Sequence, residues 1–341
     1  MNLEQLEKVA RAMVAEGKGI LAADESTPTI KKRFDAIDTE STVENRRSYR
    51  EMLFTTPGAE DYISGVILFD ETLRQSSFDG VLFPEYLAGR GMIPGIKVDR
   101  GAKTLAGFAG EKVTEGLDGL RERLAEYFDL GAQFAKWRAV ITIGNDIPSD
   151  FCIRANAHAL ARYAALCQEA DIVPIVEPEV LMDGSHTLER CYAVTADVLS
   201  QVFAELERHR VALNGIILKP NMVISGTECP ARAGIAEVAA ATVKCLTENV
   251  PVAVPGIAFL SGGQNDVEAT EHLNAMNQTG PHPWQLSFSY GRALQAPALK
   301  AWHGDADNYG AGQQALFKRA RLNGLARSGS YSSELETAAA A

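Results

Sequence analysis

Residues 172–179 read IVPIVEPE and residues 214–221 read NGIILKPN, and in both a short apolar run leads directly into a charged side chain. Continuous apolar runs of this length are typical of parallel strands that are buried on both faces. Six further stretches have the same character, at residues 19–24, 63–70, 94–99, 134–141, 252–262 and 284–291. The sequence therefore predicts eight strands that belong to a parallel sheet.

Amphipathic stretches lie between these runs. Residues 118–130 are the clearest predicted helix, with one apolar stripe made of Leu120, Leu124 and Phe128. Asp118 is the expected N-cap of this helix, because a carboxylate accepts hydrogen bonds from the first free N–H groups. Further helices are predicted over residues 43–53, 154–170 and 187–209.

The order of strands and helices predicts the fold class. Strand starts recur about every 30 to 45 residues, which suits repeated strand–helix units. Eight such units predict an α/β fold, the (β/α)8 TIM barrel, as a single domain over residues 1–327. A doubly wound open sheet is the alternative, but no GxGxxG follows the first strand. Residues 328–341 are small and polar, and we expect a flexible C-terminal tail.

Composition narrows the possible partners. The net charge of −11 argues against nonspecific binding to nucleic acid or to an anionic membrane surface. The five cysteines form no CxxC pair, which favours reduced thiols in a cytosolic protein. The sequence contains no run of 18 apolar residues and no signal-peptide pattern, so we expect a cytoplasmic protein.

Charged residues gather where the predicted strands end. Residues two apart on a strand project to the same face, and the carboxyl ends of barrel strands meet at one mouth. A charge inside an apolar run is costly unless it is paired or used, so these side chains predict a shared polar site. They are Asp24, Lys97 and Asp99, Lys136 and Arg138, Glu177 and Glu179, and Lys219.

Lys219 is the expected nucleophile of this site. Burial beside Lys136 would favour its neutral amine, through desolvation and like-charge repulsion. A neutral amine can attack a ketone to form an imine, and the protonated imine is an electron sink for cleaving the adjacent C–C bond. Asp24, Glu177 and Glu179 are the candidate proton carriers, and the sequence leaves open which of them holds a proton.

Two groups of residues predict sites for anions. Barrels often bind phosphate in the loops after the last two strands, where this chain has Ser261-Gly262-Gly263 and Ser289-Tyr290-Gly291-Arg292. A second cationic set consists of Lys32, Arg33, Lys97 and Arg138. Two cationic poles around one lysine suggest a bisphosphate.

These motifs resemble those of class I fructose-1,6-bisphosphate aldolases, and the matching stretches run in order over about residues 4–325. The resemblance implies a homotetrameric barrel in the cytoplasm that needs no metal and no cofactor. Its substrates are sugar phosphates: fructose 1,6-bisphosphate is cleaved reversibly to dihydroxyacetone phosphate and glyceraldehyde 3-phosphate. GILAADEST (19–27) is one matching stretch, and the most specific ones are FAKWR (134–138), VEPE (176–179), LKPNM (218–222), FLSGGQ (259–264) and SYGRALQ (289–295).

The same resemblance implies a role for each site residue. Lys219 would carry the Schiff base and Glu177 the acid–base steps, with Glu179 as a supporting acid. Asp24 and Lys136 would orient groups and assist proton transfer. The site of the C1 phosphate would consist of Ser261, Gly262, Ser289, Gly291 and Arg292, and the other phosphate would meet Arg33, Lys97 and Arg138.

The chain departs from the family pattern in two places. It has Pro28 and Thr29 where the family often has Gly-Ser, which affects the loop at the far phosphate. The family's C-terminal arm typically ends in a tyrosine that assists proton exchange on the enamine, but here the last tyrosine is Tyr331. Either Tyr331 substitutes for that tyrosine, or the exchange step is slower.

Other functions make different predictions. A metal-dependent aldolase is disfavoured because none of the six histidines stands in HxH or HxxxH spacing. A transaldolase-like Schiff-base barrel would not need to anchor two phosphates. A nonenzymatic scaffold would depend on a multimer surface, and no feature of the sequence indicates one.

Overall fold

A computed structural model describes residues 1–337 of the chain. Eight parallel strands form a closed barrel, which confirms the predicted (β/α)8 TIM barrel, and each predicted apolar run contains all or most of one of them. They are β1 (Gly19–Ala23), β2 (Ile63–Leu68), β3 (Ile93–Lys97), β6 (Phe134–Ile141), β7 (Val173–Val180), β8 (Ile217–Leu218), β9 (Gly256–Phe259) and β10 (Gln285–Tyr290).

The amino-terminal helix closes one end of the barrel. Helix α1 (Leu3–Met13) begins at Asn2, whose side chain accepts a hydrogen bond from the backbone N–H of Gln5. Its apolar face forms one buried cluster with side chains from the interior of the barrel, including Phe134 and Ile175. An open cavity is therefore left for the other end, where the strands reach their carboxyl ends.

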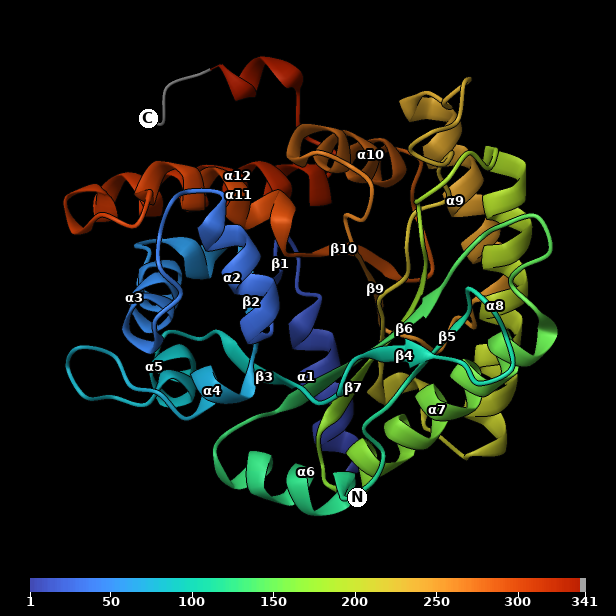
Figure 1. Ribbon diagram of the computed structural model, residues 1–341, viewed down its shortest axis with the longest axis horizontal. Helices are drawn as coiled ribbons and strands as arrows, with labels where there is room; N and C mark the ends of the chain where they lie inside the picture. The colour runs from blue at the N-terminus through green and yellow to red at the C-terminus, as the bar shows by residue number, and fades with distance from the viewer. Residues whose placement is uncertain (338–341) are drawn as a thin grey trace.

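Helices surround the barrel (Figure 1). α7 and α8 lie along one side, and α11 and α12 cross another. No helix within residues 1–337 is long and apolar enough to cross a membrane. The helices outside the barrel are α2 (Thr27–Asp35), α3 (Val43–Phe54), α4 (Asp70–Leu73), α5 (Phe83–Gly89), α6 (Leu120–Asp129), α7 (Asp150–Glu169), α8 (Leu188–Arg208), α9 (Ile235–Asn249), α10 (Asp266–Gln278), α11 (Arg292–Trp302) and α12 (Tyr309–Arg327).

The helices predicted over residues 43–53, 154–170 and 187–209 are confirmed as α3, α7 and α8, with small shifts at their ends. The helix predicted over residues 118–130 also exists, as α6, but two of its details were wrong. Its N-cap is Gly119, which has a φ of 65°, rather than Asp118. Its third buried side chain is Tyr127, while Phe128 is 49% exposed, because the helical period turns Phe128 away from the stripe.

Several elements were not predicted. The connection after β1 contains α2 as well as α3, and α4 and α5 follow β2 and precede β3. A small antiparallel hairpin of β4 (Ala102–Thr104) and β5 (Lys112–Thr114) lies between β3 and α6. These elements are short or carry few apolar residues, so their periodicity is weak in the sequence.

The C-terminal residues pack on the outer helices as far as the structure describes them. Residues 333–336 form the short 3-10 helix η4, and Tyr331 is only 6% exposed. The Tyr331 hydroxyl donates a 2.9 Å hydrogen bond to Glu336, whose carboxylate also pairs with Arg319 at 2.7 Å. Residues 338–341 of the expected tail lie outside the described part, and its flexibility stays a prediction.

Candidate active site

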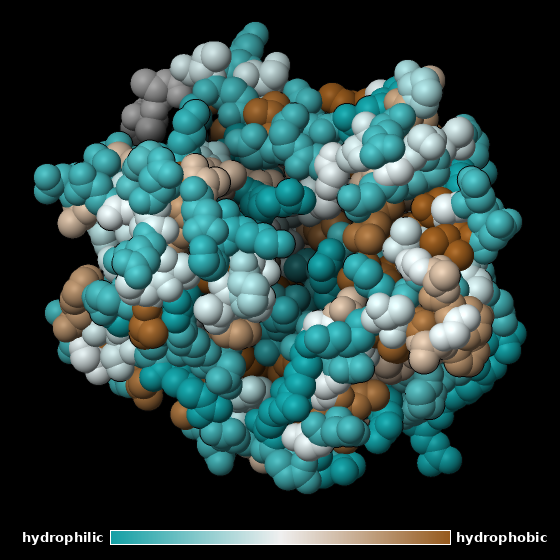
Figure 2. All heavy atoms as spheres, in the orientation of Figure 1, coloured by the Kyte–Doolittle hydropathy of each residue, from teal (hydrophilic) through white to brown (hydrophobic). Residues whose placement is uncertain are grey.

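An open cavity of about 480 Å³ lies at the carboxyl ends of the strands. Figure 2 shows it as a hollow near the centre of one face, surrounded mainly by hydrophilic side chains. All thirteen site residues predicted from the sequence line it: Asp24, Arg33, Lys97, Lys136, Arg138, Glu177, Glu179, Lys219, Ser261, Gly262, Ser289, Gly291 and Arg292. Among the lining residues cations outnumber carboxylates, although the whole chain carries a net charge of −11.

Strand register brings the charged residues together. In the register of the sheet, Lys97 of β3 lies opposite Lys136 of β6. Two residues further along β6, Arg138 lies opposite Glu177 of β7. Residues two apart on a strand face the same side, so Lys136 and Arg138 both meet β7 side chains within the mouth. The closed sheet thus fixes these positions through its backbone ladder.

Lys219 follows the short strand β8 and is only 3% exposed. Its backbone N–H donates to the carbonyl of Val176 on β7 at 2.8 Å. Two residues on, the side chain of Asn221 accepts a hydrogen bond from Val180 N and donates one to Thr195 on α8. The backbone on either side of Lys219 is therefore tied to β7 and α8, which holds the amine in the mouth.

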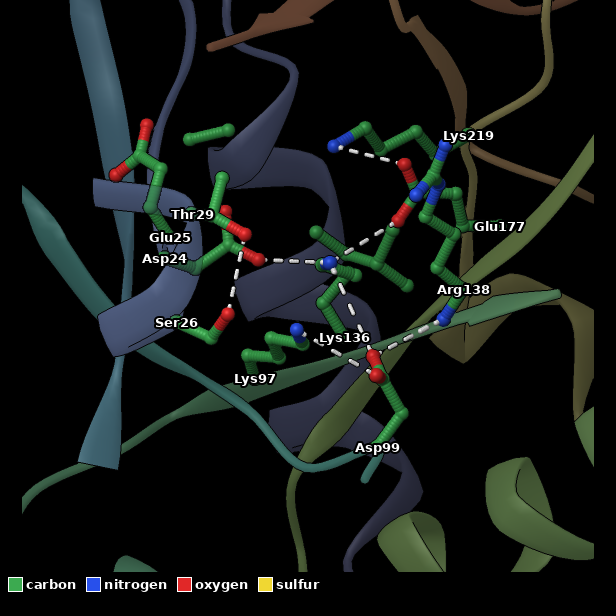
Figure 3. A network of polar contacts seen from close by, with 12 residues as sticks. Asp24, Glu25, Ser26, Thr29, Lys97, Asp99, Lys136, Arg138, Glu177 and Lys219 are labelled. Carbon is green, nitrogen blue, oxygen red and sulfur yellow. Dashed lines mark hydrogen bonds and ion pairs between the residues drawn. The ribbon is translucent and has the colours of Figure 1, made fainter. Parts of the chain in front are cut away.

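Lys136 lies at the centre of the polar network (Figure 3). Its Nζ is 2.7 Å from Asp24, 3.3 Å from Glu177 and 4.0 Å from Asp99. Burial opposes the charge of Lys136, but these three carboxylates outweigh it and raise the pKa of the ammonium. Lys136 is therefore a permanent cation of the site.

Glu177 bridges the two buried lysines. One oxygen lies 3.2 Å from Nζ of Lys219 and the other lies 3.3 Å from Nζ of Lys136. Burial alone would raise the pKa of Glu177, but Lys136 and Lys219 outweigh it and lower the pKa. Glu177 is thus an ionised carboxylate in contact with the expected nucleophile.

The environment of Lys219 differs from the sequence-based expectation in one respect. Like-charge repulsion from Lys136 was expected to favour the neutral amine, yet the carboxylate of Glu177 lies between the two nitrogens. Asp24 and Asp99 also neutralise Lys136. A proton acceptor beside the amine, rather than repulsion alone, is what the geometry offers for its activation.

Asp24 and Glu179 lie in different surroundings. Burial would raise the pKa of Asp24, but Lys136, Lys219 and Lys97 outweigh it and lower the pKa. Glu179 accepts a hydrogen bond from Nε of Arg138 and is 6% exposed. Of the three candidate proton carriers, Glu177 alone is paired with Lys219 within residues 1–337.

One end of the cavity is suited to an anion. Ser261 and Ser289 are nearly buried, and Ser289 Oγ has no hydrogen-bond partner among the described residues. Helix α11 begins at Arg292, directly after Gly291, so its positive N-terminal end meets the cavity. A Cβ at position 262 would lie 3.0 Å from Glu179 Oε1, so a larger residue there would crowd this carboxylate.

The other end contains residues that sequence reasoning missed. Arg33 and Arg50 both pair with the buried carboxylate of Glu25, and Lys97 lies 3.5 Å from Asp99, so the expected cationic pole is partly neutralised. Ser26 and Thr29 also line the cavity, and their hydroxyl oxygens are 3.1 Å apart at the start of α2. The usable signal was the Ser-Thr-Pro-Thr run, which is typical of a helix start.

Comparison with known proteins gives the family. The model of "Glycolytic: Fructose-bisphosphate aldolase class-I" matches residues 5–341. The chain belongs to the class-I fructose-bisphosphate aldolase family. A probable fructose-bisphosphate aldolase class 1 from Xanthomonas campestris pv. campestris is 61% identical, over 97% of this chain and 99% of that protein. The cytosolic fructose-bisphosphate aldolase 4 of Arabidopsis thaliana is 53% identical, over 94% of this chain and 82% of that one.

A solved fructose-bisphosphate aldolase has the same fold. Fructose-bisphosphate aldolase from Plasmodium falciparum, in a ternary crystal structure with TRAP and a small-molecule inhibitor, superposes with a TM-score of 0.95. It is 51% identical, and the match covers 96% of this chain and 95% of that one. The aldolase family and the (β/α)8 barrel inferred from the sequence are therefore confirmed.

Proposed function

We propose that this aldolase cleaves fructose 1,6-bisphosphate reversibly to dihydroxyacetone phosphate and glyceraldehyde 3-phosphate through a Schiff base on Lys219. One observation carries the proposal: Nζ of a buried lysine at the barrel mouth lies 3.2 Å from an ionised, equally buried carboxylate. Such a pair provides a nucleophile together with a group that can take and return protons.

The chemistry begins at the ketone carbon of the substrate. Glu177 takes one proton from the Lys219 ammonium, and the free amine adds to this carbon. Glu177 then returns the proton to the carbinolamine hydroxyl, which leaves as water, so that a protonated imine and an ionised Glu177 remain. Glu177 takes the proton of the C4 hydroxyl while the C3–C4 bond breaks, and the bonding electrons move to the imine nitrogen. The aldehyde leaves, and protonation and hydrolysis of the remaining enamine release dihydroxyacetone phosphate and free Lys219.

The other side chains support these steps. Lys136 and Asp24 hold the charge pattern around Glu177, and Glu179 acts as a supporting acid through its pair with Arg138. The C1 phosphate would be bound by Ser261, Gly262, Ser289, Gly291 and Arg292, beside the N-terminal end of α11. The other phosphate would meet Lys97, Arg33 and Arg138.

Trapping of the imine tests the proposal. Borohydride added with dihydroxyacetone phosphate should inactivate the protein irreversibly, and mass spectrometry should find the reduced adduct on the peptide that contains Lys219. Lys219→Met should show no adduct and no turnover, and a chelator should leave the wild-type rate unchanged. An adduct on another lysine, or turnover that survives in Lys219→Met, would refute the assignment.

Three broader proposals follow from the family. A sugar phosphate fits as the substrate class, and a cytosolic relative supports a cytoplasmic location. A homotetramer is the expected assembly, and sedimentation equilibrium of the purified chain measures it directly. Cleavage of fructose 6-phosphate at a rate equal to that of the bisphosphate would favour a transaldolase-like enzyme instead.

A further inference from the structure

Two histidines and a glutamate meet on the outer surface of the barrel, outside the candidate active site. His158 lies in the middle of α7, while Glu205 is in the last turn of α8 and His209 is its C-cap. One donor atom from each of the three lies within 4.8 Å of the others. α7 and α8 pack side by side, so residues far apart in sequence become neighbours here (Figure 1).

The three side chains are already oriented toward one another. His158 Nδ1 is 3.2 Å from Oε2 of Glu205, and His209 Nδ1 is 3.7 Å from the same oxygen. The two imidazole rings have centroids 4.9 Å apart and meet edge to face. A tetrahedral ion with bonds of about 2.0–2.1 Å needs donor atoms about 3.3 Å apart, which the 3.2 Å between His158 Nδ1 and Glu205 Oε2 matches.

Neighbouring groups fix the state of two of these donors. His209 Nδ1 lies 2.9 Å from the backbone carbonyl of Glu205; as a donor to that oxygen, it leaves Nε2 with a free lone pair, so Nε2 is the atom of His209 that would bind an ion. An imidazole that donates its other N–H to a carbonyl is the usual arrangement of a metal-ligating histidine. Arg208 binds the other oxygen of Glu205 at 2.6 Å.

The charge of Glu205 suits a cation as well. Arg208 holds one oxygen of this carboxylate, and the other oxygen, Oε2, faces the two histidines. The His158 side chain is 57% exposed, so an ion in solution can reach the site. Solvent can supply the fourth ligand, as in other sites with two histidines and one carboxylate.

We propose that His158, Glu205 and His209 form a zinc-type site that joins α7 to α8. Imidazole and carboxylate together suit Zn²⁺, whereas Mg²⁺ prefers a set of oxygen donors. None of the three residues lines the cavity that contains Lys219. The ion would therefore stabilise the outer helices behind β6 and β7 without entering the proposed reaction.

Calorimetric titration of the full chain tests the site. The protein, freed of metal with a chelator, should bind one Zn²⁺ per chain above neutral pH and should not bind Mg²⁺ there. His158→Ala and His209→Ala should each weaken Zn²⁺ binding by about tenfold or more. Arg154→Ala is the matched control, because Arg154 lies one turn from His158 on α7 but pairs with Asp150, so it should bind Zn²⁺ like wild type.

Thermal unfolding provides a second readout. Zn²⁺ should raise the Tm of wild type and of Arg154→Ala by mass action, and should not raise that of either histidine variant. The absence of saturable Zn²⁺ binding to wild type, or binding that survives either histidine substitution, would overturn the proposal. Neither result would bear on the proposed aldolase reaction, because imine trapping on Lys219 tests that reaction separately.

Discussion

Replacing Glu177 with glutamine should preserve the structure of the site but remove its proton carrier. The change keeps the shape of a side chain that is 3% exposed and removes one negative charge. At 3.2 Å and 3.3 Å, and with an effective dielectric constant of about 20, each of its two ion pairs has a gross Coulomb energy of about 5 kcal/mol. The question is which lysine depends on that charge.

Lys136 would keep its charge in this variant. It still pairs with Asp24 at 2.7 Å, a gross interaction of about 6 kcal/mol on the same scale, and with Asp99 at 4.0 Å. Lys219 instead loses its one carboxylate partner among the described residues. The variant thus removes the proton acceptor beside Lys219 and leaves Lys136 and the shape of the site in place.

The turnover of Glu177→Gln should therefore fall mainly through lost proton transfer. We expect kcat to drop by about 10²- to 10⁴-fold, or about 3–5 kcal/mol in activation free energy, with a much smaller change in KM. Steady-state release of triose phosphates from fructose 1,6-bisphosphate measures both constants, and circular dichroism checks the fold.

Glu179→Gln is the matched control for this experiment. Glu179 lies on the same strand and is similarly buried, but it pairs with Arg138. We expect its kcat to fall by about tenfold or less, since this carboxylate supports the proton carrier without pairing with Lys219. If Glu177→Gln kept kcat within tenfold of wild type, or if Glu179→Gln proved the more damaging change, the assignment of Glu177 as proton carrier would be wrong.

Three more predictions follow from the structure. Arg292→Ala should raise KM for fructose 1,6-bisphosphate by about tenfold or more, with less effect on kcat, because a charge-assisted hydrogen bond to phosphate is worth about 1.5–3 kcal/mol. Burial would raise the pKa of Glu25, but Arg50 and Arg33 outweigh it and lower the pKa. The ionised Glu25 therefore stabilises the fold at pH values above its ordinary pKa of 4.5, and this stabilisation is lost as the pH falls through the lowered pKa of the folded state. Glu25→Gln should thus cost about 3–5 kcal/mol at neutral pH and give a flatter acid dependence of the urea midpoint. Tyr331→Phe should lose about 1 kcal/mol of stability but keep turnover and enamine proton exchange near wild type, because its hydroxyl binds Glu336; slowed exchange would show that Tyr331 reaches the cavity.

The strands were predictable because burial on both faces leaves a local mark. Each barrel strand overlaps a continuous apolar run, and the charged residues that follow several of these runs mark the mouth. α2 left a weaker signal, since only Ile30 and Phe34 of its nine residues are buried. The burial of Tyr127 rather than Phe128 likewise depends on how α6 is rotated against the barrel, which periodicity defines only to within one residue.

The sequence could not predict which charged side chains would form ion pairs with one another. Asp99 was predicted to belong to the polar site, but its contact with Lys136 follows only from the pairing of β3 with β6. In the same way, His158 and Glu205 are 47 positions apart, so no local spacing could indicate their contact. Local patterns predict which strand ends carry charge, but ion pairs follow from register between strands and from packing between helices.

The alternation of charge around Lys136 has a consequence for the proposed reaction. The protonated imine on Lys219 keeps the positive charge of the ammonium, so Glu177 can remain its counter-ion at 3.2 Å before cleavage. When the C–C bond breaks, the nitrogen becomes a neutral enamine and Glu177 becomes a neutral acid in the same step. Both charges vanish together, so the buried site never holds an uncompensated ion. The charge of Lys136 stays neutralised in that step, because Asp24 and Asp99 remain ionised beside it. A buried lysine with three carboxylates around it is thus suited to a site in which one of those carboxylates gains and loses a proton in every turnover.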